Sequence, residues 1–334
     1  MDNIQSLFVK NVLRGAGSAL KESGSAFAAS NIALSKYWGK RDAALNLPIN
    51  SSLSISLGNL GTRTEIRRAD SNSVRLNGVS VDLTNSFAVR MMEFLKLFPA
   101  VGTHFEVRTE NTVPTAAGLA SSASGFAALV MALDDLAGWG LDKKRLSMLA
   151  RLGSGSASRS LFNGFVQWNA GTAADGLDSY AESLSSDWKE FRIGILELSR
   201  ARKSVGSRDG MNRTVETSEL YKSWPGQANR DIEIIREAIV TQDFPTLGKT
   251  AEQNALSMHA TMMSAWPPLI YLQPESIEMI HKVQRIRAEG LEVYLTMDAG
   301  PNIKLIFQEK DECAVAAEFA ALQIIKPLDG ISSV

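Results

Sequence analysis

Residues 114–125 form a run of small side chains whose hydroxyls and glycines suit the binding of phosphate. They read Pro-Thr-Ala-Ala-Gly-Leu-Ala-Ser-Ser-Ala-Ser-Gly. An alternating segment, residues 104–109, precedes them as a half-buried strand would, and apolar residues three and four apart follow from Phe126 as in a helix. Such a loop points backbone N–H groups at one place, where the helix dipole favours an anion. Tight packing of the helix on a sheet is the alternative explanation.

A second candidate site lies in residues 31–42, which read Asn-Ile-Ala-Leu-Ser-Lys-Tyr-Trp-Gly-Lys-Arg-Asp. Three cations, Lys36, Lys40 and Arg41, share six positions with two aromatic rings. A charge cluster alone is typical of a solvated surface. The rings between the lysines favour instead a wall that holds ammonium groups toward an anion, and lysine is a compact charge that suits phosphate.

A third stretch, residues 153–159, reads Gly-Ser-Gly-Ser-Ala-Ser-Arg. Glycines allow close approach of backbone N–H groups, and Arg159 can grip a carboxylate or phosphate with two parallel hydrogen bonds. The apolar residues that follow up to Trp168 need burial, which disfavours a flexible surface loop. We therefore expect residues 153–159 to form an anion site in addition to the phosphate loop of residues 114–125.

One carboxylate, Asp298, stands in a turn after the apolar residues 295–297. An aspartate in a turn commonly bonds its own backbone, which is the simplest explanation for it. Residues 203–212, expected to be a polar loop, add Arg208 as a further cation. Two anion sites and one carboxylate are a sensible set for phosphoryl transfer, which depends mainly on positioning and charge stabilisation.

The composition is that of an ordinary globular protein of 334 residues, with 45% hydrophobic residues and a net charge of −1. That charge gives no support for nucleic-acid binding. The single cysteine, Cys313, excludes a disulfide within the chain, and the three histidines are too far apart to suggest a metal site. No apolar run is long enough to span a bilayer, and residues 1–25 lack the apolar core of a secretory signal. We expect a cytoplasmic protein with no membrane partner.

The pattern of elements indicates an α+β protein. Strands are expected at residues 26–34, 53–57, 62–68, 74–76, 79–83, 104–109, 164–170, 191–198, 291–297 and 303–308. Helices are expected at residues 87–98, 126–136, 143–152, 218–242, 246–263, 276–289 and 312–325. Asn77-Gly78 predicts a hairpin turn, and Asp142 is a candidate N-cap. Residues 4–13 are either a helix or a loose tail.

The polar stretch 171–189 is the expected domain boundary. It divides the chain into an N-terminal extension, residues 1–25, an N-terminal domain, residues 26–189, to which the family resemblance described below assigns ATP binding, and a C-terminal domain, residues 190–334.

Taken together, these motifs resemble those of the diphosphomevalonate decarboxylases of the GHMP kinase superfamily. The similar segments are residues 31–42, 47–54, 114–125, 153–161 and 298–302. The resemblance implies a two-domain α+β GHMP kinase fold with the active site in the cleft between the domains. It also implies ATP and Mg²⁺ as cofactors, (R)-5-diphosphomevalonate as substrate, and a homodimer. The implied products are isopentenyl diphosphate, CO2, ADP and phosphate, formed after phosphorylation of the C3 hydroxyl in the mevalonate route to isoprenoids.

The resemblance also implies a role for individual residues. Four are implied in catalysis: Asp298 at the tertiary hydroxyl, Arg159 at the substrate carboxylate, and Lys36 and Ser122 at the ATP phosphates, with Ser122 also near Mg²⁺. The implied substrate-binding residues are Tyr37, Trp38, Gly39, Lys40, Ser154, Gly155, Ser156, Ala157, Ser158, Arg159, Arg208 and Met211. The implied ATP-binding residues are Asn111, Pro114, Ala117, Gly118, Leu119, Ala120, Ser121 and Ser122.

The sequence departs from the family in a few places. Arg208-Asp209 replaces a small hydroxyl-bearing pair of the eukaryotic members and fits the bacterial ones. An arginine that eukaryotic members carry soon after the Asn77-Gly78 region has no clear counterpart. The alternative functions are a related kinase that stops after 3-phosphorylating mevalonate or its monophosphate, a decarboxylase of the monophosphate, and a GHMP-fold binding protein without turnover.

Overall fold

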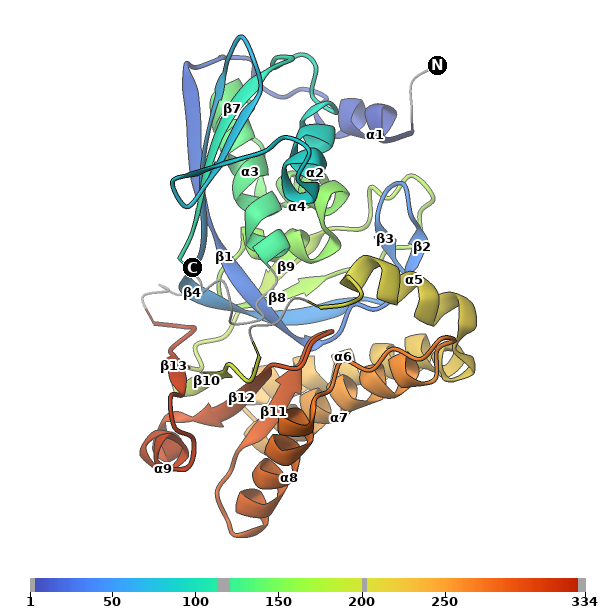
Figure 1. The fold of residues 1–334 in the computed structure, drawn as a ribbon, viewed down its shortest axis with the longest axis vertical. Coiled ribbons are helices and arrows are strands. Elements are labelled where there is room, and N and C mark those ends of the chain that lie inside the picture. The colour runs from blue at the N-terminus through green and yellow to red at the C-terminus, as the bar shows by residue number, and fades with distance from the viewer. Residues whose placement is uncertain (1–3, 113–120, 200–202, 330–334) are drawn as a thin grey trace.

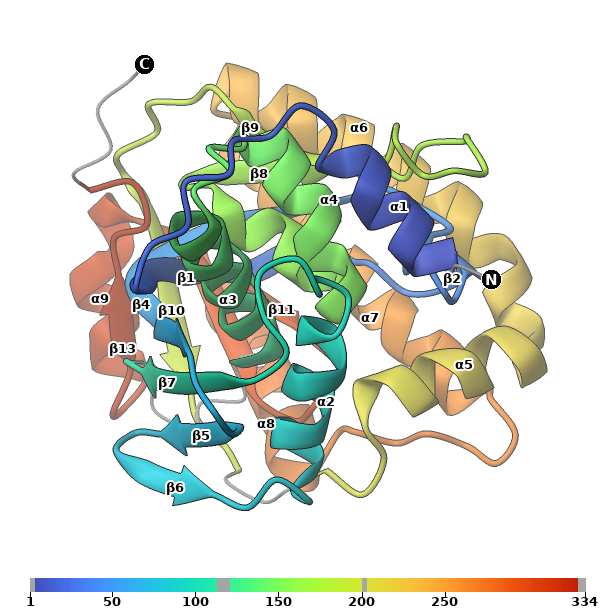
Figure 2. The same ribbon diagram turned by 90° about the horizontal axis from the view of Figure 1, so that it is seen from above.

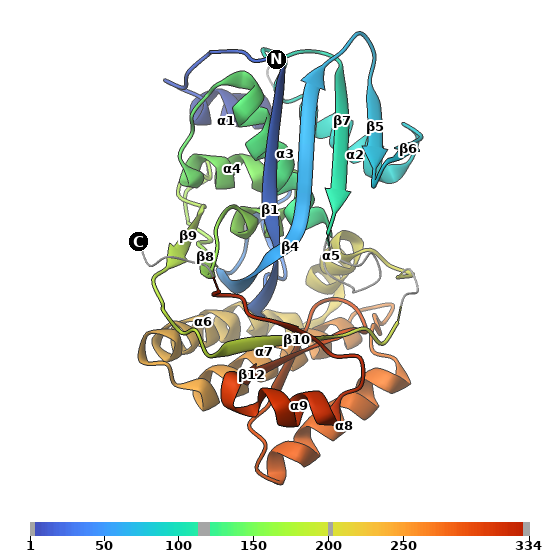
Figure 3. The same cartoon turned by 90° about the vertical axis from the view of Figure 1, so that its left-hand side faces the viewer.

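Two β-sheets, each packed against helices, form the two domains of the protein (Figure 1). The computed structural model describes residues 4–112, 121–199 and 203–329, and leaves the side chain of Ser121 undescribed. The N-terminal domain lies above the C-terminal domain in Figure 1, and the long strands of the upper sheet run down toward the lower one (Figure 3).

The N-terminal sheet is built around two long antiparallel strands, β1 (Ser23–Ser35) and β4 (Ser52–Arg68). The separate strands expected at residues 53–57 and 62–68 are one strand, because pairing with β1 continues across a shift in register near Ala29. The other strands of this sheet are β5 (Ser73–Leu76), β6 (Val79–Val81), β7 (Phe105–Asn111), β8 (Phe165–Trp168) and β9 (Ala181–Leu184). Its order is β6-β5-β7-β4-β8-β9, with β1 also paired to β4.

The turn between β5 and β6 has the predicted chemistry. Asn77 and Gly78 both have positive φ, 50° and 80°, as a type I′ hairpin turn requires. A further hairpin, not expected from the sequence, pairs β2 (Lys40–Asp42), the end of the lysine-rich segment 31–42, with β3 (Leu47–Pro48).

Helices cover one side of the N-terminal sheet. α3 (Ser121–Ala137) packs along β1 and β4, and α4 (Lys143–Gly153) packs against α3. The predicted N-cap is confirmed, because the Asp142 carboxylate accepts a hydrogen bond of 2.8 Å from the Arg145 N–H. α2 (Ser86–Leu95) contacts α4, and a 3₁₀-helix, η1 (Gly155–Leu161), follows α4.

The N-terminal segment is a helix and not a loose tail. α1 (Ile4–Val12) buries Phe8, Val9 and Val12 and lies beside α4 (Figure 2). The Arg145 guanidinium on α4 donates to the Val12 carbonyl, with an Nε–O distance of 2.7 Å. This contact ties the end of α1 to the domain.

The C-terminal sheet has the order β11-β12-β10-β13. Its strands are β10 (Phe191–Leu196), β11 (Tyr294–Met297), β12 (Ile303–Gln308) and β13 (Gln323–Ile325). α7 (Phe244–Met263) and α8 (Pro274–Ala288) contact β11, and α6 (Trp224–Thr241) packs on α7. The remaining elements are α5 (Ser207–Thr217), α9 (Glu312–Glu318), η2 (Glu219–Ser223) and η3 (Glu309–Asp311).

Three expectations for this half were wrong. Residues 203–212, expected to be a polar loop, contain the start of α5, whose glycines and polar residues hide its helical pattern. The helix expected from Ser218 begins as η2, and α6 proper starts at Trp224 with Pro225 in its first turn. The last helix ends at Glu318, and Ala321 with φ 59° turns the chain into β13.

The two domains share an apolar core. Ile32 and Ile55 from β1 and β4 are fully buried in one cluster with Ile193 of β10 and Ile235 of α6. The lower ends of the long strands are thereby fixed against the C-terminal domain, which positions the residues that follow β1. Within the described ranges, no helix is both long and apolar enough to cross a membrane.

Candidate active site

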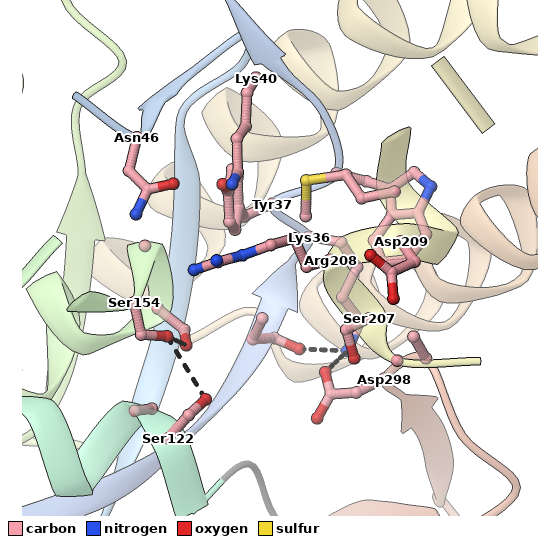
Figure 4. Close-up of a pocket in the computed structure, with 18 of the residues that line it drawn as sticks. Lys36, Tyr37, Lys40, Asn46, Ser122, Ser154, Ser207, Arg208, Asp209 and Asp298 are labelled. Atoms are coloured by element: carbon pink, nitrogen blue, oxygen red, sulfur yellow. Dashed lines mark hydrogen bonds and ion pairs between the residues drawn. The ribbon is translucent and has the colours of Figure 1, made fainter. Parts of the chain in front are cut away.

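A cavity of about 500 Å³ lies where the two domains meet (Figure 4). Its walls come from the segment after β1, from α2 and α5, from the starts of α3 and η1, and from the turn after β11. Twelve of the predicted site residues line it: Lys36, Tyr37, Trp38, Lys40, Ser122, Ser154, Gly155, Ser156, Arg159, Arg208, Met211 and Asp298.

The chemistry of the cavity centres on a pair between Lys36 and Asp298, which come from different domains. Lys36 Nζ lies 2.9 Å from Asp298 Oδ1 and also donates to the Ala33 carbonyl at 2.8 Å. Lys304 Nζ lies 3.7 Å from Asp298 Oδ2. The Lys36 side chain is 2% exposed, whereas that of Asp298 is 31% exposed, so the carboxylate is the more accessible member of the pair.

These contacts shift both pKa values. Burial lowers the pKa of Lys36 to about 8, against the opposing effect of Asp298. Burial by itself would raise the pKa of Asp298, but the ammonium groups of Lys36, Lys304 and Lys203 outweigh it and hold that pKa far below its usual range. Asp298 is therefore ionised at neutral pH.

Buried amides hold the backbone of Lys36 in place. Its N–H donates to Asn254 Oδ1 and its carbonyl accepts from Asn50 Nδ2, each at 2.8 Å. The backbone of Asp298 is held by His259, whose Nε2 lies 3.0 Å from the Asp298 carbonyl oxygen. Since a carbonyl only accepts, Nε2 carries the hydrogen. Burial lowers the pKa of His259 to about 4, so this imidazole stays neutral. His259, one of the histidines given no role from the sequence, thus supports the carboxylate.

The aromatic residues between the lysines form one wall. The Trp38 carbonyl accepts hydrogen bonds from Tyr221 (2.8 Å) and Trp224 (3.1 Å). Gly39 has φ 114°, and a Cβ there would lie only 1.7 Å from the Tyr221 hydroxyl oxygen. Gly39 is thus a packing requirement and does not line the cavity. The Tyr37 ring packs edge-on against Trp168, and its buried hydroxyl has no hydrogen-bond partner among the described residues.

Hydroxyls from two elements meet at the start of η1. Ser154 Oγ lies 3.4 Å from Ser122 Oγ of α3 and 3.2 Å from Ser156 Oγ (Figure 4). Two neighbours predicted to bind substrate, Ala157 and Ser158, are buried and do not line the cavity. Ser158 Oγ instead donates to the Ser147 carbonyl, at 3.2 Å.

Arg159 is a buried cation that has no acidic partner among the residues the structure describes. It is 3% exposed and donates to Ser52 Oγ and, at 3.4 Å, to Asn31 Oδ1. Its Nε atom has no partner, and no carboxylate of the described residues lies within ion-pair distance. Burial lowers the pKa of Arg159 to about 10. A buried guanidinium that lacks a carboxylate is costly, and an anionic ligand would supply what is missing.

The predicted nucleotide residues are only partly described. Pro114, Ala117, Gly118, Leu119 and Ala120 lie outside the described residues, and Ser121 begins α3. Asn111 ends β7 and does not line the cavity. Its Oδ1 accepts a 2.7 Å hydrogen bond from Thr62, whose hydroxyl also lies 2.7 Å from Ser124 Oγ on α3. A role of Asn111 at the nucleotide therefore remains a prediction.

The sequence missed several residues that line the cavity, among them Asn46, Ser86, Arg90, Ser207 and Asp209. Asn46 lies in the turn of the unexpected β2–β3 hairpin, and Ser207 and Asp209 lie on the unexpected α5. Ser86 and Arg90 lie on α2, and their four-residue spacing places them on one helix face. Which face meets the cavity depends on tertiary packing, so no local signal identifies them.

Comparison with known protein families agrees with this geometry. Residues 28–181 match the model of the diphosphomevalonate decarboxylase-like N-terminal domain. Residues 193–327 match that of the mevalonate 5-diphosphate decarboxylase C-terminal domain. The chain belongs to the diphosphomevalonate decarboxylase family. Among the curated members, the enzyme of Aspergillus fumigatus is 39% identical over 317 residues, 87% of this chain and 78% of that protein. The enzyme of Danio rerio is 41% identical over 295 residues, 81% of this chain and 72% of that protein.

Solved structures of diphosphomevalonate decarboxylases have the same fold. The mevalonate diphosphate decarboxylase of Enterococcus faecalis superposes with a TM-score of 0.84 at 41% identity, covering 90% of this chain and 95% of that one. The Staphylococcus aureus enzyme gives a TM-score of 0.86 at 36% identity, covering 91% and 95%. The two-domain α+β GHMP kinase fold expected from the sequence is confirmed.

Proposed function

We propose that this diphosphomevalonate decarboxylase converts (R)-5-diphosphomevalonate and ATP to isopentenyl diphosphate, CO2, ADP and phosphate. One observation carries the proposal: a single cavity holds two complementary groups. One is the ionised carboxylate of Asp298, paired with Lys36, and the other is the buried guanidinium of Arg159, which has no carboxylate partner in the described part of the chain. The names of the relatives support this reaction and not a kinase that stops after 3-phosphorylation.

The chemistry explains why a decarboxylase needs a kinase fold. A β-hydroxy acid loses CO2 slowly, because hydroxide is a poor leaving group at C3. Transfer of a phosphoryl group to that hydroxyl makes it a good leaving group. When phosphate departs, the C–CO2 bond supplies its electron pair to the electron-poor tertiary carbon, and an alkene and CO2 result.

We assign to Asp298 the placement of the C3 hydroxyl and the acceptance of its proton. Because three ammonium groups lower the pKa of Asp298, the carboxylate is a weak base toward a free hydroxyl. The hydroxyl becomes strongly acidic only as its oxygen bonds to phosphorus, so proton transfer is expected late in the step. Before then, Asp298 acts chiefly by orienting the hydroxyl.

The cavity suits a magnesium nucleotide. In the described ranges, no three His, Cys, Asp or Glu side chains are grouped to hold a metal, so phosphate oxygens and water would provide most ligands of Mg²⁺, which is usual for this ion. Ser122 at the start of α3 is the proposed protein contact, and Lys36 the proposed cation at the phosphates. When bound, Mg²⁺ neutralises charge on the phosphates.

A solved structure with 41% identity and a TM-score of 0.85 is a complex with MVAPP, AMPPCP and magnesium, which supports the proposed set of ligands.

We propose further that the protein is a cytoplasmic homodimer and that its domains meet near residue 190, with residues 1–25 as an extension. Family resemblance supports the homodimer. The two matched segments, 28–181 and 193–327, support the boundary.

The first test of the proposed function is substrate choice. Lys40, Arg208 and the Ser154 and Ser156 hydroxyls provide enough positive charge and donors for two phosphates. We expect kcat/KM for mevalonate diphosphate to exceed that for the monophosphate about a hundredfold or more, because buried polar groups otherwise lose their partners. CO2 and ADP should be measured together. Comparable turnover of both substrates would refute the assignment, and ADP without CO2 would indicate a kinase.

Ser122→Ala tests the phosphate end of the cavity. Loss of the hydroxyl beside Ser154 should lower kcat more than it raises the KM for ATP, if the contact tightens in the transition state. Ser204→Ala, at an exposed serine that does not line the cavity, is the matched control. Unchanged kcat and KM in Ser122→Ala would place the nucleotide elsewhere.

A further inference from the structure

Arg90 on α2 faces the active-site cavity, although no role for it was expected. It lines the cavity together with Lys40 of β2 and Arg208 of α5, so cations from three separate elements converge. Burial is the main cause of the lowered pKa of both Arg90 and Lys40, and the charge of Arg208 adds to it in each case. Arg90 in turn lowers the pKa of Lys40. The three cations are therefore electrostatic neighbours.

Among the described residues, no acidic side chain forms an ion pair with these three cations. The carboxylates that line the cavity are Asp209 and Asp298, and Asp298 is engaged by Lys36 and Lys304. In the part of the chain that the structure describes, neither Lys40, Arg90 nor Arg208 forms an ion pair. Like charges repel at such a site, and an anion with several charges relieves that repulsion.

Arg90 is held in place with most of its donors unused. One Nη atom donates to the Gly153 carbonyl at 3.2 Å, and Cζ lies 5.4 Å from the centre of the Phe126 ring. A guanidinium has five N–H donors, and the structure gives the others of Arg90 no hydrogen-bond partner among the described residues. Gly153 directly precedes Ser154, so Arg90 adjoins the hydroxyls at the start of η1.

Arg90 also lines a smaller hollow together with Ser122, so it lies between the two ends of the cavity, and its charged neighbours favour the substrate's diphosphate over the nucleotide. Its charged neighbours are Arg208 and Lys40, whereas Lys36, Lys203 and Lys304 surround Asp298. In Figure 4, Lys40 lies at one end of the cavity, and Ser122 and Asp298 lie at the other. A diphosphate at the Lys40 end carries more charge and more acceptor oxygens than a monophosphate.

We propose that Arg90 is the third cation of the diphosphate site and a residue that determines the preference for diphosphate over monophosphate. This inference rests on the proposed function for the identity of the substrate. It assigns a contact with the substrate diphosphate to α2, a helix that contributes no residue to the sequence motifs described above.

The test is Arg90→Gln, which keeps a polar side chain and removes the charge. We expect KM for mevalonate diphosphate to rise about ten- to hundredfold, the usual loss for a hydrogen bond to a charged group, with kcat less affected and KM for ATP within about twofold. The preference over the monophosphate should shrink by a similar factor. Arg90→Lys should recover part of the loss, because it restores a point charge.

Direct measurement of binding tests the role of Arg90 independently of the proposed reaction. Calorimetric titration with inorganic pyrophosphate and with inorganic phosphate needs no turnover, and Arg90→Gln should weaken pyrophosphate binding more than phosphate binding. Lys96→Gln removes one charge from the end of the same helix, where the side chain is 69% exposed and pairs with Glu93, and should change neither. Thermal denaturation should show Arg90→Gln folded like the wild type.

Two results would overturn the proposal. One is a pyrophosphate affinity in Arg90→Gln within about twofold of wild type. The other is an equal loss of ATP and pyrophosphate binding that Arg90→Lys does not repair, which would mean that Arg90 only supports Gly153. If the wild-type protein failed to release CO2, the proposed function would fail. Pyrophosphate binding that depends on Arg90 would then still establish the diphosphate contact.

Discussion

Asp298→Asn is expected to bind ATP and substrate nearly as well as the wild type and to turn over about a thousandfold or more slowly. The amide keeps the shape of the side chain and one acceptor, but it cannot take the proton of the C3 hydroxyl. It also removes the negative charge 2.9 Å from Lys36 Nζ. Both effects fall on the step that transfers the phosphoryl group.

The decisive measurement is the fate of the substrate. The variant should form neither CO2 nor a 3-phosphorylated intermediate, because both come after the blocked step. Accumulation of the 3-phosphate would show that Asp298 acts later and that the proposed order is wrong. Asp209→Asn removes another carboxylate of the same cavity, one without a contact to Lys36, and should lose far less activity.

Stability has to be separated from chemistry in this variant. Removing Asp298 leaves the buried ammonium of Lys36 without this carboxylate. The loss of one partner costs about 3–5 kcal/mol in a fully buried pair, and less here because Asp298 is 31% exposed. Lys36 is 2% exposed, and the loss of Asp298 removes the interaction that raises the lysine pKa. Thermal denaturation and calorimetric binding of ATP should therefore accompany the rate measurement.

The motifs of the site could be predicted because each is local in the sequence. The segments around Lys36, Ser154 and Asp298 each combine residue types that serve anions or phosphoryl transfer, and all three line one cavity. Gly39 was assigned to the substrate with them, but its backbone conformation serves the contact with Tyr221. Position within a motif therefore does not distinguish a residue that contacts the ligand from one that is needed only for packing of the backbone.

The missed parts of the site depend on tertiary structure. Arg90 comes from a helix whose sequence indicates only an amphipathic element, and its contact with Gly153 joins segments 63 residues apart. α5 was missed because glycines at 206 and 210 weaken the helical pattern of a polar segment. Packing against the rest of the C-terminal domain determines this helix: Met211 and Thr214 are buried.

Long-range pairing also explains why two strands expected from the sequence form a single strand, β4. Residues 53–57 and 62–68 have separate alternating patterns, with Gly58 and Gly61 between them. In the structure β1 pairs along both, and a Cβ at Gly61 would lie 2.1 Å from the Ala28 carbonyl oxygen. The glycine that suggests a break between strands is therefore required for their close approach.

Arg159→Lys is expected to remain folded and to lose two or more orders of magnitude in turnover. The guanidinium can hold a carboxylate through two parallel hydrogen bonds, and it is oriented by Ser52 and Asn31. Lysine offers a point charge that cannot reproduce this fork. A carboxylate that is free to rotate loses the alignment that departure of CO2 requires.

Burial adds a second reason for this loss. It lowers the pKa of Arg159 to about 10, so the guanidinium keeps its charge at neutral pH. A lysine begins with a pKa about two units or more below that of arginine, so the same burial would leave much of it neutral near pH 8. The activity of Arg159→Lys should therefore fall more steeply between pH 7 and pH 9 than that of the wild type. The wild-type arginine stays charged in this range, and Lys36, with a pKa of about 8, titrates in both proteins.

The control is Arg41→Lys, in the same lysine-rich segment as Lys40. Arg41 is exposed and donates to the carbonyls of Ala170 and Ala173, so this variant should keep near-normal turnover. CO2 release should be followed from pH 6.5 to 9 in both variants, with substrate affinity measured by calorimetry. A near-normal rate in Arg159→Lys would show that this arginine serves the fold alone. A large loss without the alkaline decline would show that hydrogen-bond geometry, and not charge, is what the carboxylate requires.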